Sequence, residues 1–186
     1  MFLACCWTMK DINDKTIPMN YKEKIKIFIV EDDTFFNKMI ENHLKTINKS
    51  GGFQDYFFST NSYSTGEECL KNLSKNPDII ILDYYLDSEN KSAQNGFRTL
   101  QQIKKKNKNV IVIILSSQQE MVMTVELLKA GAYDYVMKDD SCFFRIGALV
   151  QKILNEKQLR RKKQNNILVK VAAMVLLLIL LTALIV

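Results

Sequence analysis

The sequence has few residues that bind soft metals or form disulfides. Its 186 residues include one histidine, His43, and none of the four cysteines belongs to a Cys-x-x-Cys pair. A structural zinc site needs about four Cys and His ligands at suitable spacing, so none is expected. Disulfide frameworks stabilise small secreted chains that lack a core, whereas 47% of this chain is hydrophobic. We therefore expect reduced thiols, as in a cytosolic protein.

The sequence also lacks acidic residues after Glu156. Six of its 26 Lys and Arg lie beyond that point, so residues 1–156 carry 20 basic and 20 acidic side chains, and the net charge of +6 belongs to the tail. A DNA-binding domain usually has a basic patch on its folded body. The stretch after Lys157 is also too short for a helix-turn-helix domain together with an apolar span. Nucleic acid is therefore not an expected partner.

A long uncharged run lies at the end of the sequence. Residues 167–186 contain one charged side chain, Lys170. At about 1.5 Å per residue, a helix of this length matches the roughly 30 Å core of a bilayer. Basic residues beside a span mark its cytoplasmic side, and four precede this one: Arg160, Arg161, Lys162 and Lys163. We predict a transmembrane helix over 167–186, a basic juxtamembrane linker over 158–166 and a body on the cytoplasmic face of the cytoplasmic membrane. A buried core helix or an oligomerisation helix is the alternative.

The beginning of the chain does not resemble a signal peptide. Its apolar start, Met1–Trp7, is too short and lacks a basic region before it. We expect residues 1–23 to be a loose leader that precedes the folded body.

The body alternates strand patterns with helix patterns. Apolar, β-branched runs predict five strands, over 24–30, 54–58, 78–83, 110–115 and 133–137. Helical patterns follow each strand, over about 34–47, 65–74, 97–106, 118–130 and 141–159. The third and fourth strands have wholly apolar interiors, as parallel strands buried on both faces do. The pattern predicts an α/β fold with a doubly wound, five-stranded parallel sheet and five helices.

Polar residues gather where the predicted strands end. Glu31, Asp32 and Asp33 follow the first strand. The third, fourth and fifth strands end in Asp83, Ser116 and Lys138, respectively. The carboxyl ends of parallel strands meet at one edge, where ligands bind. Clustered carboxylates repel one another, and a hard cation such as Mg²⁺ relieves that repulsion. Carboxylates beside a lysine and a hydroxyl suit phosphoryl transfer, with a carboxylate as nucleophile. Asp33 alone is more readily explained as a helix cap.

Four segments together resemble a known family. They are Ile27–Asp33, Pro77–Asp83, Ile113–Ser117 and Gly131–Lys138. In this order they resemble the receiver domain of two-component response regulators, over about residues 24–157. The resemblance implies a flavodoxin-like fold with the strand order 2-1-3-4-5.

The resemblance also implies a role for each site residue. Asp83 would be the phosphoacceptor, taking a phosphoryl group from a histidine kinase or a phosphotransfer protein. Mg²⁺ would be held by Asp32 directly, by Glu31 through water, by Asp83 and by the main-chain carbonyl of Tyr85. Three residues would contact the phosphoryl group or follow its arrival, namely Ser116, Lys138 and Tyr135.

The sequence departs from the family at two loops. Asp139 stands where the family usually has proline after the lysine, and a polar stretch over 87–95 lengthens the loop after Asp83. Neither change removes a ligand. We expect a membrane-tethered receiver that signals by protein contact and is not an enzyme. A phosphate-indifferent pseudo-receiver adaptor is the alternative, whereas a phosphatase of the haloacid dehalogenase kind would need an acid at the position of Tyr85. The kinase, the downstream target and the oligomeric state are not predicted.

Overall fold

The chain folds around a parallel sheet of five strands. The computed structural model describes residues 23–49, 53, 55–86, 95–117 and 121–185, without the side chains of 121–123, 172 and 176–185. The strands are β1 (Glu23–Val30), β2 (Tyr56–Tyr63), β3 (Ile79–Asp83), β4 (Ile111–Ser116) and β5 (Asp134–Met137). Their order in the sheet is β2-β1-β3-β4-β5. The predicted fold class and strand order are confirmed, while the predicted leader over 1–23 lies almost entirely outside the described residues.

The prediction for the second strand, 54–58, was wrong in its extent. β2 continues to Tyr63, although Ser59–Ser62 are polar. The reason is its partner, because all eight residues of β1 pair with β2, from Glu23 opposite Tyr56 to Val30 opposite Tyr63. β2 is also an outer strand of the sheet, where polar side chains are tolerated.

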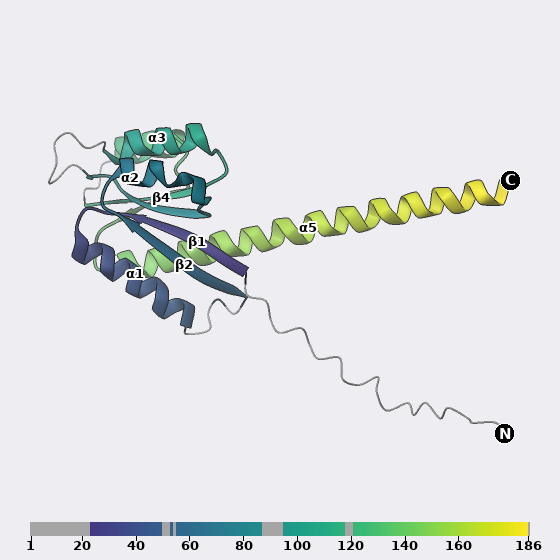
Figure 1. Ribbon diagram of the computed structural model, residues 1–186, viewed down its shortest axis with the longest axis horizontal. Coiled ribbons are helices and arrows are strands. Elements are labelled where there is room, and N and C mark those ends of the chain that lie inside the picture. Colours follow the sequence, from purple (N-terminus) through teal and green to yellow (C-terminus); the bar gives the residue numbers. More distant parts are fainter. Residues whose placement is uncertain (1–22, 50–52, 54, 87–94, 118–120, 186) are drawn as a thin grey trace, which may run out of the picture.

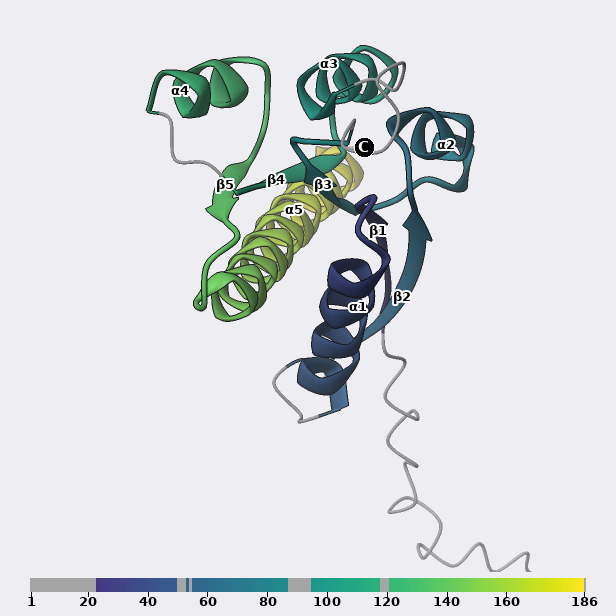
Figure 2. The ribbon, with the colours of Figure 1, turned by 90° about the vertical axis from the view of Figure 1, so that its left-hand side faces the viewer.

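Helices cover both faces of the sheet (Figure 2). One face is covered by α1 (Thr34–Lys49) and α5 (Cys142–Ile185), and the other by α2 (Gly66–Lys71), α3 (Gly96–Lys106) and α4 (Met121–Lys129). Alternate residues of each strand enter opposite cores, so Ile27 and Ile29 pack towards α1 and α5 while Phe28 and Val30 pack towards α2 and α3. This period of two explains why strands of continuous apolar sequence lie in the centre of the sheet.

Local signals set the ends of several helices. Asp33 caps α1, because its Oδ1 accepts hydrogen bonds from the main-chain N–H groups of Phe35 and Phe36. The predicted second helix is shorter than expected, since α2 gives way to a single 3₁₀ turn, η1 (Leu73–Lys75), before Pro77. Gly131, with φ of +99°, follows α4 in the left-handed conformation that glycine adopts readily.

The last helix, α5, is 44 residues long and extends far beyond the sheet (Figure 1). Among the side chains of α5 that the structure describes, the last buried one is that of Leu154, and residues 159–171 are exposed. Because α5 includes residues 158–166, the stretch that was predicted as a linker is helical. Among the residues that the structure describes, no helix is both long and apolar enough to cross a membrane. Most side chains of the predicted span at 167–186 lie outside that description, so the span stays a prediction.

Candidate functional site

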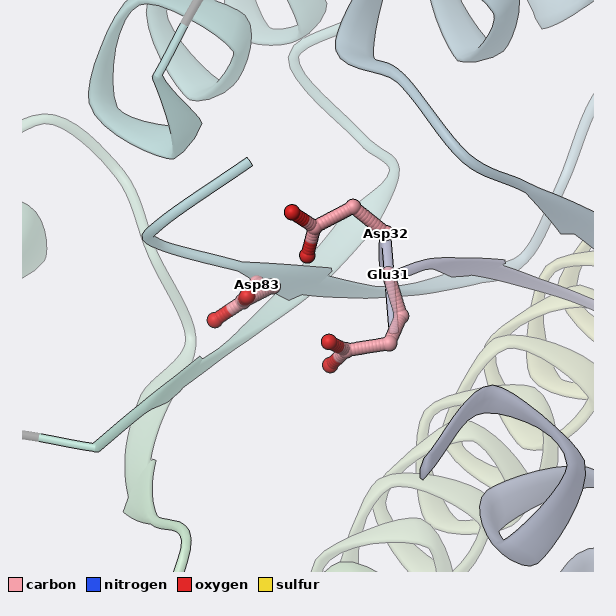
Figure 3. A group of neighbouring side chains, drawn as sticks. All are labelled: Glu31, Asp32 and Asp83. Carbon is pink, nitrogen blue, oxygen red and sulfur yellow. The ribbon is translucent and has the colours of Figure 1, made fainter. Parts of the chain in front are cut away.

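Three carboxylates meet at the edge where the strands end. Glu31 and Asp32 follow the last residue of β1, and Asp83 is the last residue of β3. One oxygen from each lies within 4.8 Å of the other two. Glu31 and Asp32 leave opposite sides of the chain, yet both carboxylates lie on the side of Asp83 (Figure 3). Glu31 and Asp83 are each only 2% exposed, so the cluster places negative charge inside the protein.

Lys138 brings positive charge to the two buried carboxylates. Its Nζ lies 2.8 Å from Oε2 of Glu31 and 3.0 Å from Oδ2 of Asp83. The residue reaches this position because its main-chain N–H donates to the carbonyl of Ser116, which extends the pairing of β5 with β4. The Nζ also lies 4.8 Å from the ring centre of Phe36, which gives the ammonium a second favourable contact.

The cluster remains short of positive charge. Burial and the neighbouring Asp83 carboxylate raise the pKa of Glu31 to about 7, although Lys138 opposes the change. Burial also raises the pKa of Asp83, against the opposing effects of Lys138 and the main-chain N–H of Tyr85. Burial alone would lower the pKa of Lys138, but the two carboxylates outweigh burial and raise it. One lysine therefore compensates only part of the negative charge.

The donor set fits a hard divalent cation. It consists only of carboxylate oxygens, which Mg²⁺ prefers. Oδ1 of Asp83 is buried and has no hydrogen-bond partner among the described residues, and a buried acceptor in this state is costly unless something binds it. Glu31, Asp32 and Asp83 could hold the cation, which would offset the charge that Lys138 leaves uncompensated.

The other predicted residues lie around this cluster at different depths. Ser116 is fully buried at the end of β4. Tyr135 lies on β5, half-buried and packed against the core on the α2 and α3 side. Tyr85 follows Asp83 by two residues, and its ring contacts that of Tyr84 edge-on at 4.8 Å. The structure thus brings Lys138 into contact with the carboxylates, while the roles of Ser116, Tyr135 and the Tyr85 carbonyl stay predictions.

The loop with Asp139 still delivers Lys138 to the cluster. Oδ1 of Asp139 accepts hydrogen bonds from the main-chain N–H and the hydroxyl of Ser141, at 2.9 and 2.7 Å. These bonds close the turn that leads into α5, so proline is not needed to shape it. The other departure, the polar stretch over 87–95, lies outside the described residues except for Asn95. That residue caps α3 by accepting from the N–H of Arg98 at 3.0 Å.

Sequence reasoning missed two residues that support the site. Gly96 begins α3, and its N–H donates to the carbonyl of Tyr84 at 2.8 Å. A Cβ on Gly96 would lie 2.7 Å from the Cα of Tyr84 and closer still to the carbonyl oxygen of Asp83. Asn37 is buried on α1, and its Nδ2 donates to the carbonyl of Glu31 at 3.2 Å. The Asn95-Gly96 pair signalled a turn, but nothing in the sequence indicated which strand end it contacts.

Comparison with known proteins agrees with this fold. The family model described as the response regulator receiver domain matches residues 27–153. The chain therefore belongs to the response regulator receiver family, whose members are signalling domains.

Individual relatives are distant in sequence. The chain is 28% identical to the chemotaxis protein CheY of Thermotoga maritima, over 61% of this chain and 84% of that protein. It is 30% identical to the transcriptional regulatory protein MalR of Bacillus subtilis, over 61% of this chain and 44% of that protein. The receiver domain of NtrX from Brucella abortus superposes with a TM-score of 0.58 at 19% identity, covering 69% of this chain and 98% of that one. The chain spans 55% or less of the length of three further relatives.

Proposed function

We propose that the chain accepts a phosphoryl group on Asp83 in a two-component phosphorelay. The donor would be a phosphohistidine on a histidine kinase or a phosphotransfer protein. A carboxylate oxygen of Asp83 attacks phosphorus, the phosphorus–nitrogen bond breaks, and the imidazole leaves with its bonding electron pair and takes up a proton. The product is an acyl phosphate on Asp83 and an unmodified histidine on the donor.

The observation that carries this proposal is the contact of Lys138 with Asp83 beside two further carboxylates. The Nζ that now lies 3.0 Å from Oδ2 of Asp83 can follow the charge onto the phosphoryl oxygens. A bound Mg²⁺ would supply further charge neutralisation at those oxygens. The buried hydroxyl of Ser116 and the ring of Tyr135 lie on the two neighbouring strands. We propose that Ser116 and Tyr135 change position when Asp83 is phosphorylated and thereby alter the face formed by α4 and β5. This face would then signal by contact with another protein.

The test is labelling of the purified full chain by a small acyl phosphate. We expect stoichiometric labelling in the presence of Mg²⁺, none after chelation and none in Asp83→Asn, because the amide has no nucleophilic oxyanion. Phosphate-affinity electrophoresis and intact mass measure the product. Equal labelling of the wild type and Asp83→Asn would contradict the proposal, and no labelling of either would favour the pseudo-receiver reading.

A matched control is available next to the acidic pair. Asp33 is an exposed cap of α1, and asparagine caps a helix about as well as aspartate. Asp33→Asn removes a carboxylate from the same loop and keeps the fold. We expect it to be labelled like the wild type, which separates the loss of the phosphoacceptor from a general loss of negative charge.

We also propose that the segment over 167–186 tethers the domain to the cytoplasmic membrane, with the folded body in the cytoplasm. The support is the single charge in those 20 residues and the basic run before them, which includes Arg160 and Lys163. Tethering would raise the effective concentration of the receiver near membrane-bound kinases.

Fractionation of cells tests the tether directly. The full chain is expected in the membrane pellet and to resist extraction by high salt and carbonate. A chain that lacks 164–186 is expected in the supernatant. Replacing Arg160, Arg161, Lys162 and Lys163 by glutamine is the control for charge alone, and an apolar span should still hold this variant in the membrane. Recovery of the full chain in the supernatant would contradict the tether.

A further inference from the structure

We call the side of the sheet at which the strands begin its starting edge. Polar contacts connect this edge to α5 at the point where the helix leaves the domain. Leu154 is the last buried residue of α5 within the part of the helix whose side chains are described. Beyond it, the next two turns carry polar side chains that reach the beginnings of four different strands. The residues they reach are Glu23 in β1, Asp55 before β2, Asp78 before β3 and Tyr133 before β5.

We call this set of contacts between α5 and the starting edge the clamp. Lys157 and Arg161 form its centre. Nζ of Lys157 lies 2.8 Å from Oδ1 of Asp78 and 3.0 Å from Oε1 of Glu23. The guanidinium of Arg161 meets both carboxylate oxygens of Glu23, which is the two-pronged geometry that orients arginine most strongly. Oδ2 of Asp78 is bound in turn by the main-chain N–H of Lys26 at 3.0 Å, so the clamp connects directly to the sheet backbone.

Two further contacts widen the clamp around the helix. The hydroxyl of Tyr133 donates to Oε1 of Glu156 at 2.9 Å. Nε2 of Gln158 lies 3.5 Å from Oδ2 of Asp55, on the opposite side of the sheet's centre. An ion pair that is exposed on its own contributes little, but a network on several strands restrains the tilt of a helix in more than one direction.

The clamp lies at the edge of the sheet opposite the phosphoacceptor. Strands run from Glu23, Asp78 and Tyr133 at one edge to the acidic cluster at the other. α5 starts at Cys142, on the acidic side, and crosses the whole sheet before it leaves (Figure 1). At about 1.5 Å per residue, Ile167 lies about 37 Å along the helix axis from Cys142.

We infer that α5 is a stalk whose direction relative to the sheet is fixed by the clamp. In this orientation the starting edge of the sheet faces the C-terminal tail, and the edge with Asp83 faces away from it. Resting on the proposed tether, this inference assigns the surface that faces the anionic inner leaflet: the starting edge, with the exposed residues Lys108 and Asn109 and the basic turn around Arg160. A donor protein then approaches Asp83 from the cytoplasmic side, on the far side of the domain from the bilayer.

Spin-label distances in the full chain test the stalk without a membrane. Labels go on exposed positions at the two edges, Asn109 and Asp140, each paired with a label at Asn166 on α5. Cys5 and Cys6 are replaced by serine, whereas Cys69 and Cys142 are buried and stay. We expect one narrow distance for each pair in detergent solution, with the 140–166 distance the longer.

A double variant and a matched control decide whether the clamp sets that direction. Glu23→Gln with Asp78→Asn keeps the size of both side chains and removes their charge, so we expect loss of the single narrow distances. Glu41→Gln removes a comparable ion pair on α1, where Glu41 meets Lys45 at 2.7 Å, and should leave the distances unchanged. Narrow, unshifted distances in the double variant would overturn the clamp.

Energy transfer to headgroup-labelled lipid tests the orientation at a membrane. The full chain, with a fluorophore at position 109 or 140, is reconstituted in nanodiscs of phosphatidylcholine and phosphatidylglycerol. Transfer is expected to be strong from 109 and weak from 140. Equal or reversed transfer overturns the orientation. If the chain does not enter the nanodiscs, the tether fails, and the spin-label distances alone support or overturn the stalk.

Discussion

Gly96→Ala is expected to lower the free energy of unfolding by about 3 kcal/mol, the upper end of the usual cost of overpacking. The added methyl group would meet main-chain atoms of Asp83 and Tyr84, and no side chain there can rotate out of its way. Relief requires either α3 or the end of β3 to shift. Because Asp83 is the last residue of β3, the shift would also displace the phosphoacceptor, and labelling by an acyl phosphate should fall. Urea unfolding followed by circular dichroism measures the stability.

Gly147→Ala is the matched control, with the opposite expected sign. Gly147 lies inside α5, and its new methyl group would have 3.4 Å to Nε2 of His43 and 3.7 Å to Cδ1 of Ile47. Alanine is favoured over glycine inside a helix by about 0.5–1 kcal/mol. An equal loss of stability in both variants would show that the position of the methyl group does not decide the effect.

Lys138→Met is expected to destabilise the protein by about 3 kcal/mol at neutral pH without Mg²⁺, since removing one partner of a buried ion pair leaves the other uncompensated. Methionine keeps most of the lysine stem, so the packing against Phe36 remains and the change isolates the charge. The loss of stability is expected because Nζ of Lys138 lies within 3.0 Å of both Glu31 and Asp83, so the substitution leaves two carboxylates without their positive partner.

The cost of Lys138→Met should depend on pH in a defined direction. The pKa of Glu31 is raised in the folded state to about 7 from its ordinary 4.5. A raised acid pKa means that the folded state binds the proton more tightly, so stability falls as the pH rises through that window. Removing the lysine raises the pKa of Glu31 and Asp83 further. We expect a large loss of stability at about pH 8 and a smaller one at about pH 5.5, where Glu31 accepts a proton at little cost.

A double variant checks the origin of that loss. Asp83→Asn removes one of the two carboxylates, so Lys138→Met should cost less in that background than in the wild type. Urea unfolding of the four proteins in chelator at both pH values measures the coupling. Equal costs in both backgrounds, or a larger loss at the lower pH, would contradict the electrostatic explanation.

Much of the fold and of the acidic edge could be predicted because the relevant patterns are local. The apolar runs that became β3 and β4, and the polar residue at the end of each, are readable within a few residues of sequence. Since all strands of such a sheet are parallel, knowing the strand ends is enough to place Asp83 and Lys138 at one edge. The extent of β2 was not readable, because it depends on pairing with β1 across 33 positions of sequence.

The sequence by itself determined the alternation of strands and helices and the edge that carries the carboxylates. It also determined that the tail consists of a basic run followed by an apolar segment. Only the tertiary structure decided that Lys138 contacts both Glu31 and Asp83, that Gly96 lies against the Asp83 backbone and that α5 is clamped to the starting edge. Each of these contacts joins groups on different helices and strands, such as Glu23 on β1 and Arg161 on α5. Periodicity reports which face of an element is buried, whereas such pairs depend on how whole elements pack.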